Sequence, residues 1–132
     1  MTLYVDSSAL LKRYVDEHDS EAAVELMATD QVLVTSRLTE IEVRRNLARL
    51  LDGDAWTASR RQFAVDLDAF ALIGLDATTC NEAAAIAERT GCRSLDALHL
   101  GSAVRAGAST MLTFDLRQAQ AARTIGLAVI GV

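Results

Sequence analysis

The sequence predicts an α/β fold: a three-layer sandwich with a central, mostly parallel, five-stranded sheet flanked by about seven helices. Short apolar stretches alternate with longer stretches of helical pattern, as in parallel sheets that are covered on both faces. The chain has 132 residues, 51% of them hydrophobic, so we expect one core and a single domain over 1–132. It contains no proline and is rich in alanine and leucine, which favour helices.

The chain begins with a predicted strand and two predicted helices. Residues 2–6 (Thr-Leu-Tyr-Val-Asp) form a short apolar run that is typical of a buried strand. Ser7 or Ser8 can cap a helix over 9–15, because a serine hydroxyl accepts a hydrogen bond from the first turn. A polar break then separates this helix from a second one over about 20–29.

The middle of the chain repeats this order with longer helices. Residues 31–35 are rich in β-branched side chains and predict the second strand, after which Ser36 opens a long helix. That helix carries apolar residues at helical spacing, namely Leu38, Ile41, Leu47, Leu50 and Leu51. The Asp-Gly-Asp sequence at 52–54 ends it, and a helix over 55–70 and a strand over 71–75 follow.

Two more helices precede the fourth strand. Thr79 and Glu82 have capping-box spacing for a helix that Gly91 ends. Ser94 is expected to cap the next helix, which ends near Gly107.

The last part of the chain predicts two strands around one helix. The strands cover 109–113 and 127–130, and the helix between them covers 115–125. Gly126 ends that helix.

Charge and cysteine content narrow the classes of function. The net charge of −5 argues against a broad basic surface for nucleic acid, although 12 of the 13 basic residues are arginines, which suit contacts with phosphate. Cys80 and Cys92 fit no zinc or redox motif, so we expect reduced, partly buried thiols. No uncharged apolar run approaches the roughly 18 residues of a membrane span, and no basic leader is visible, so a cytoplasmic protein is expected.

Three aspartates fall where a parallel sheet gathers its ligands, outside the carboxyl ends of the strands. Asp6 ends the first predicted strand, Asp115 follows the fourth, and Asp96 lies in the first turn of the helix that leads to the fourth. Glu42, one to two turns into the helix after the second strand, can face the same cleft. Carboxylates without a basic partner repel one another unless a cation lies between them, and oxygen ligands favour Mg²⁺ or Mn²⁺.

Structural roles explain the same acids equally well from position alone. Asp6 and Asp115 can simply cap the helices that follow them. Glu42 lies three residues after Thr39 and can complete a capping box, and Asp96 in a first helical turn is stabilised by the helix dipole. We interpret His99, between two leucines, as a core-facing histidine.

At these residues the sequence resembles the PIN-domain family, in particular its VapC-type toxin branch. Residues 3–12 are similar to the family's opening strand with its first metal-binding aspartate, Asp6, and residues 35–43 to the segment that carries its glutamate, Glu42. Residues 94–103 are very close to the family signature Asp-Ala-Leu-His-Leu, and Leu112-Thr113-Phe114-Asp115 resembles its last motif. Some relatives carry a further acid after the last aspartate, where this chain has Leu-Arg-Gln.

The resemblance implies a PIN-like fold and a toxin that hydrolyses RNA with Mg²⁺ or Mn²⁺. It also implies a homodimer, a cognate VapB-type antitoxin and a larger assembly of the two. In the mechanism that we hypothesise, the three aspartates hold one or two ions, and Glu42 holds a metal-bound water or completes the ligand set. Supporting residues are candidates for orienting the carboxylates (Ser7 and Thr113) and for contacting RNA phosphates (Arg13 and Arg117).

The sequence fits three other classes of function less well. A receiver-type signalling domain needs paired acids after the first strand and a lysine after the last, but Ser7 and Ser8 follow Asp6, and the only lysine is Lys12. An aspartyl phosphatase would have a second aspartate where Ser8 stands. A catalytically silent PIN-fold module that binds RNA or protein is disfavoured by the presence of all four acids.

Overall fold

Five parallel strands form the centre of the protein. The computed structural model describes residues 2–29 and 31–132, and in them the strands have the order β3-β2-β1-β4-β5 with every neighbouring pair parallel. The predicted five-stranded sheet is therefore confirmed. The strands are β1 (Thr2–Val5), β2 (Val32–Ser36), β3 (Ala71–Ile73), β4 (Thr110–Thr113) and β5 (Ala128–Gly131).

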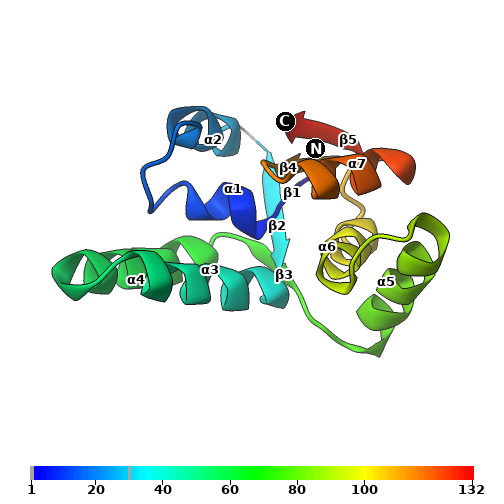
Figure 1. Cartoon of the computed structure of the whole chain (residues 1–132), viewed down its shortest axis with the longest axis horizontal. Coiled ribbons are helices and arrows are strands. Elements are labelled where there is room, and N and C mark those ends of the chain that lie inside the picture. Colours follow the sequence, from blue (N-terminus) through cyan, green and yellow to red (C-terminus); the bar gives the residue numbers. More distant parts are fainter. Residues whose placement is uncertain (1, 30) are drawn as a thin grey trace.

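Helices cover both faces of this sheet, as Figure 1 shows. One face carries α1 (Ser7–Leu11), α2 (Ser20–Met27), α3 (Arg37–Leu50) and α4 (Gly53–Leu67). The other face carries α5 (Ala77–Thr90), α6 (Ser94–Arg105) and α7 (Leu116–Thr124). None of the helices in the described residues combines the length and the apolar character that a membrane span requires.

The alternation of side chains along β1 divides the core between the two faces. Leu3 and Val5 point to the first face and pack with α1 to α4, whereas Tyr4 points to the second face and packs with α5 to α7. All three side chains are fully buried, because the central strand has a helical layer on each side.

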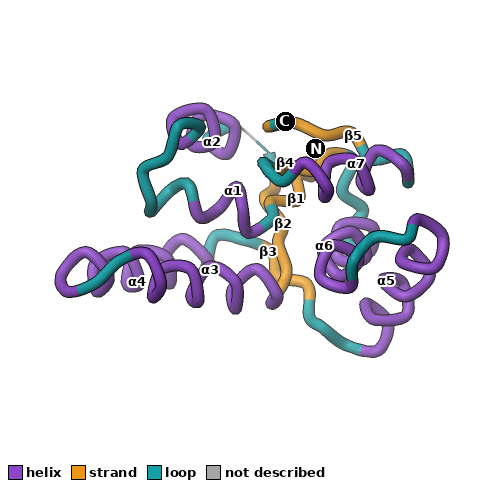
Figure 2. The backbone as a smooth tube through the Cα atoms, viewed as in Figure 1, coloured by secondary structure: helices purple, strands orange, loops and turns teal. Residues whose placement is uncertain are grey.

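The chain reverses its direction across the sheet between β1 and β4. It runs outward from β1 through β2 to β3, and then crosses back to add β4 and β5 on the other side of β1. A crevice forms at the carboxyl ends of the two strands where such a reversal occurs, and ligands bind there in open α/β sheets. In Figure 2 the loops that leave β1 and β4 lead directly into α1 and α7.

Two predicted helix starts are wrong because an upstream aspartate provides the cap. The helix α1 begins at Ser7 and ends at Leu11, since the Asp6 side chain accepts a hydrogen bond from Ala9 N, and neither serine is its N-cap. Likewise Asp76, not Thr79, caps α5 by accepting from Thr79 N.

Three further expectations also need correction. The N-cap of α6 is Arg93, which forms no side-chain capping bond, so Ser94 is the first residue of the helix and not its cap. The helix α4 already begins at Gly53, inside the predicted break, because the extended Asp52 is its N-cap and the Asp52 carbonyl accepts the first helical hydrogen bond, from Trp56 N. Both cysteines are free, as expected, but Cys80 is exposed and only Cys92 is partly buried.

We predict that Gly101→Ala destabilises the protein by at least about 1 kcal/mol, the lower end for overpacking in a tight core. A methyl group at Gly101 on α6 would lie 2.9 Å from the backbone nitrogen of Ala83 on α5, so the two helices would have to separate. Urea unfolding measures the change. Gly74→Ala is the matched control, because its methyl group would meet no atom within 4 Å; equal stability of the two variants would contradict the prediction.

Candidate active site

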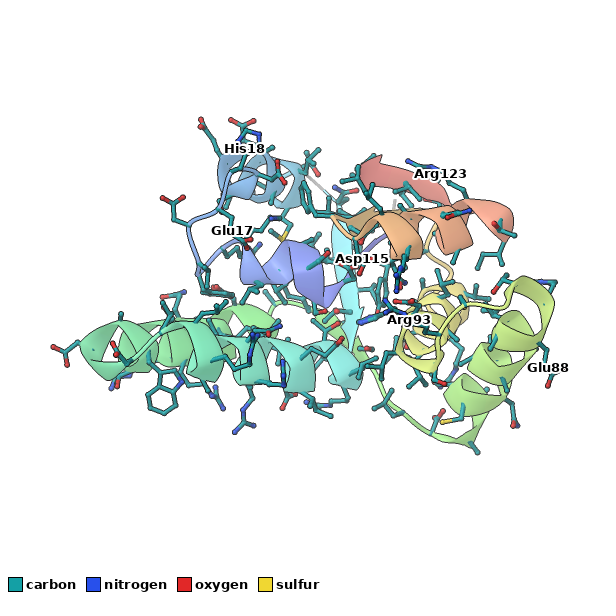
Figure 3. The ribbon with its side chains drawn as sticks, in the orientation of Figure 1. Glu17, His18, Glu88, Arg93, Asp115 and Arg123 are labelled. Carbon is teal, nitrogen blue, oxygen red and sulfur yellow. The ribbon has the colours of Figure 1, made fainter. Side chains whose placement is uncertain are left out.

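Three of the four predicted acids line one pocket at the carboxyl edge of the sheet. Glu42, Asp96 and Asp115 border a cavity of about 380 Å³. Its remaining lining residues are Arg93, Ser94 and Leu95. Asp115 and Arg93 are labelled in Figure 3 and lie close together at the centre of the molecule, between α7 and α6.

The fourth acid, Asp6, is buried where β1 ends. Its Oδ1 accepts hydrogen bonds from Ser8 Oγ at 2.7 Å and Ala9 N at 3.1 Å, and its Oδ2 accepts one from Thr113 Oγ1 at the end of β4. Burial raises the pKa of Asp6, although these hydrogen bonds and the nearby His99 oppose the shift. A buried carboxylate of this kind favours a nearby cation.

Glu42 is held by two donors that come from other elements of the fold. Ser7 Oγ donates to its Oε1 at 3.1 Å, and His99 Nε2 lies 2.6 Å from the same oxygen. Burial alone would raise the pKa of Glu42, but the bonds from His99 and Ser7 outweigh it and lower that pKa. Glu42 is therefore a carboxylate oriented by its neighbours, and its interpretation as a capping partner of Thr39 is wrong, since Ser36 Oγ accepts from Thr39 N.

His99 is buried, as predicted, but it belongs to this site. Its Nδ1 lies 2.8 Å from Tyr4 Oη, so the imidazole joins β1 to α3. Burial alone would lower the pKa of His99, but Tyr4, Glu42 and the nearby Asp6 outweigh it and raise the pKa to about 10. The expectation that the acids lack a basic partner is thus wrong.

The two remaining acids have local partners as well. Arg93 Nε donates to Asp96 Oδ2 at 3.3 Å. Asp115 is the N-cap of α7, and its Oδ1 accepts from Arg117 N at 2.9 Å and Gln118 N at 3.0 Å. The capping role leaves one oxygen of this carboxylate available, because Asp115 Oδ2 has no hydrogen-bond partner among the described residues.

The donor set of the pocket fits a hard divalent cation. Its ionisable acceptors are carboxylates, which Mg²⁺ and Mn²⁺ prefer. Glu42 Oε2, like Asp115 Oδ2, has no hydrogen-bond partner in residues 2–29 and 31–132. In that same part of the chain no three His, Cys, Asp or Glu side chains converge on one point, so the acids border the pocket without enclosing an ion.

The comparisons with known proteins agree with this geometry. The family described as PIN domain matches residues 3–124. The chain belongs to the PIN domain family. The resemblance seen in the four motifs is thereby confirmed.

Curated relatives of this PIN domain protein are ribonucleases. It is 35% identical over 130 residues to Ribonuclease VapC46 of Mycobacterium tuberculosis, covering 97% of this chain and 95% of that protein. It is 34% identical over 134 residues to Ribonuclease VapC35 of the same species, with the same coverage.

Solved structures show the same fold at lower identity. FitAcB from Neisseria gonorrhoeae matches with a TM-score of 0.78 and 19% identity, over 98% of this chain and 96% of that one. The toxin VapC20 of Mycobacterium tuberculosis, which cleaves the sarcin–ricin loop, matches with a TM-score of 0.74 and 20% identity, over 90% of this chain and 94% of that one.

Of the four supporting residues predicted from the sequence, three lie near the acids of this PIN domain and one, Arg13, does not. Ser7 contacts Glu42, and Thr113 Oγ1 donates to Asp6 and accepts from Asp115 N. Arg117 lines a second pocket of about 270 Å³, of which Arg93 and Asp96 also form part. Arg13 does not reach either pocket: it lies 3.9 Å from Asp66 and over the ring of Phe70.

Sequence reasoning missed four residues that contact the acids directly or through one neighbour: Tyr4, Ser8, Arg93 and His99. For His99 a signal existed, because it follows Asp96 by three residues and therefore shares its helix face. For Tyr4 no signal existed, because only the packing of α6 against β1 brings its hydroxyl to the imidazole.

We predict that Asp6→Asn stabilises the metal-free protein, raising its Tm in EDTA by about 3–5 °C, the shift that roughly 1 kcal/mol produces in a chain of this size. The substitution removes a buried charge while keeping its shape and an oxygen acceptor. Thermal unfolding measures the change. Asp54→Asn, at an exposed position on α4, is the control; a lower Tm for Asp6→Asn than for this control would contradict the prediction.

Proposed function

We propose that this PIN domain protein is a VapC-type toxin that hydrolyses RNA phosphodiester bonds with Mg²⁺ or Mn²⁺. The observation that carries the proposal is the pocket that Glu42, Asp96 and Asp115 line, with the buried Asp6 beside it at the point where the sheet reverses. The ribonuclease names of the curated relatives, which the chain covers almost fully, support the same activity.

In the proposed mechanism Asp6, Asp96 and Asp115 would hold one or two divalent ions, directly or through water. Such an ion would supply a more acidic water and neutralise charge on the scissile phosphate. Glu42 would hold and orient the attacking water at Oε2, the oxygen that Ser7 and His99 leave free, or complete the ligand set. Hydrogen bonds from Ser8 and Thr113 keep Asp6 in place.

Arginines beside the pocket bind the RNA backbone. Arg93 and Arg117 border the adjoining cavity of about 270 Å³, and guanidinium groups there can contact the phosphates that flank the scissile one. Such contacts position the RNA without reading its sequence. They also let a protein with a net charge of −5 attract a polyanion locally.

The proposal extends to partners and organisation. The solved structures with this fold include a VapBC assembly of Rickettsia felis, with a TM-score of 0.71, and this favours a VapB-type antitoxin for the present chain. The acidic pocket suits an arginine side chain of such an antitoxin. We extend the proposal to a single PIN domain over residues 1–132, a homodimer, and a cytoplasmic site of action, where RNA and antitoxin are made.

We predict that Asp96→Asn and Glu42→Gln each lower RNA cleavage by more than about 100-fold, because groups that only support a metal ligand already contribute 10- to 100-fold. The assay follows cleavage of total bacterial RNA in Mg²⁺ or Mn²⁺, with and without EDTA.

The exposed residues Asp54 and Glu88 provide isosteric controls, Asp54→Asn and Glu88→Gln, which should cleave like the wild type. Full activity of the Asp96 and Glu42 variants would overturn the assignment of those acids. Cleavage that persists in EDTA would overturn the metal mechanism, and binding of RNA without any cleavage would favour the catalytically silent module.

A further inference from the structure

A continuous chain of hydrogen bonds runs from the core of the protein to the pocket. It begins at Tyr4 on the central strand, passes through the imidazole of His99 on α6 and reaches Glu42 on α3. The two links measure 2.8 Å and 2.6 Å. Tyr4 is fully buried and His99 nearly so, whereas the Glu42 side chain is 26% exposed at the pocket.

The direction of the second link follows from the chemistry of its two ends. The oxygens of an ionised carboxylate only accept hydrogen bonds, so His99 Nε2 is the donor to Glu42 Oε1. Nδ1 lies against Tyr4 Oη, and a hydroxyl can donate to a ring nitrogen or accept from it, so this link holds the ring in either protonation state. Because Tyr4 holds Nδ1, Nε2 is the ring nitrogen that faces Glu42.

The contacts of Glu42 are all made on one of its two oxygens. Ser7 Oγ and His99 Nε2 both bond to Oε1, and Oε2 has no hydrogen-bond partner among the described residues. A carboxylate held at one oxygen by two donors from different elements cannot rotate freely, so its second oxygen is presented to the pocket that Glu42 lines.

A purely structural role for His99 would require only that both of its buried nitrogens find partners. Its location argues for more than that. One partner is an acid of the site, and the residue three positions earlier on the same helix is Asp96. His99 thus contacts one of the four acids and lies one helical turn from another.

We propose that His99 is a positioning residue: held by Tyr4 at Nδ1, it donates from Nε2 to Glu42 and orients that carboxylate for the hydrolytic step. This inference rests on the proposed function, because orienting Glu42 affects hydrolysis only if Glu42 holds the attacking water or an ion. Donors of this kind to site carboxylates commonly contribute 10- to 100-fold to metal affinity or rate.

Two amide variants test separately the hydrogen bond of His99 to Glu42 and its hydrogen bond to Tyr4. In His99→Gln the amide nitrogen takes the place of Nε2 and still reaches Glu42, whereas in His99→Asn it takes the place of Nδ1 and reaches only Tyr4. We expect His99→Gln to keep Mn²⁺ affinity and kcat within about 5-fold of the wild type. We expect His99→Asn to lose at least about 10-fold in both, with little change in KM.

The measurements are Mn²⁺ binding, followed by the electron paramagnetic resonance of the free ion, and RNA cleavage. Thermal unfolding in EDTA checks that the two variants are equally stable. His18→Asn is the matched control, because His18 is the other histidine and its side chain is fully exposed. His99→Asn with the affinity and kcat of the wild type, or equal losses in both His99 variants, would overturn the inference.

A failure of the proposed function gives a different result. If the wild type binds Mn²⁺ but cleaves no RNA, the proposed ribonuclease activity is contradicted. The Mn²⁺ affinities of the two variants then still decide whether His99 positions Glu42. A wild type that binds no Mn²⁺ overturns both. If neither His99 variant folds, Tyr4→Phe decides instead: reduced Mn²⁺ affinity supports the inference and unchanged affinity overturns it.

Discussion

The buried carboxylate of Asp6, at the end of the central strand, is the constraint on which the other features of the site depend. Removing a carboxylate from water is costly unless donors or cations surround it. The parallel pairing of β1 with β4 brings Thr113 to one of its oxygens, and the turn into α1 brings Ser8 and Ala9 N to the other. The same pairing places Asp115 just beyond the end of β4. The topology of the sheet therefore determines where Asp6 and Asp115 lie relative to each other.

Positive charge on α6 and on the residue before it balances this acidic edge. Arg93 precedes α6 and pairs with Asp96, while His99, on the same helix, pairs with Glu42. These pairs explain how four acids can gather in a folded protein before any ion binds. Helix α6 packs tightly on α5 through Gly101. It also brings Asp96 to the pocket and His99 to Glu42, and Arg93 directly precedes it.

The sequence was sufficient for the order of elements, because apolar strands and amphipathic helices have distinct periods. Helix starts were harder, since Asp6 and Asp76 compete as caps with nearby serine and threonine. In the site, Asp6 and Asp115 followed from strand ends, whereas Glu42 depended on the family motif. His99 could not be paired with Glu42, because 57 positions separate them and helical periodicity carries no information on contacts between helices.

The proposed function requires the acids at the carboxyl edge of the sheet to hold a divalent cation. Anomalous X-ray diffraction from crystals soaked in Mn²⁺ can locate such an ion without reference to activity. We predict an anomalous peak in the pocket lined by Glu42, Asp96 and Asp115, beside Asp6. Absence of a peak in this pocket at saturating Mn²⁺, or a peak only elsewhere, would contradict a metal site at these acids.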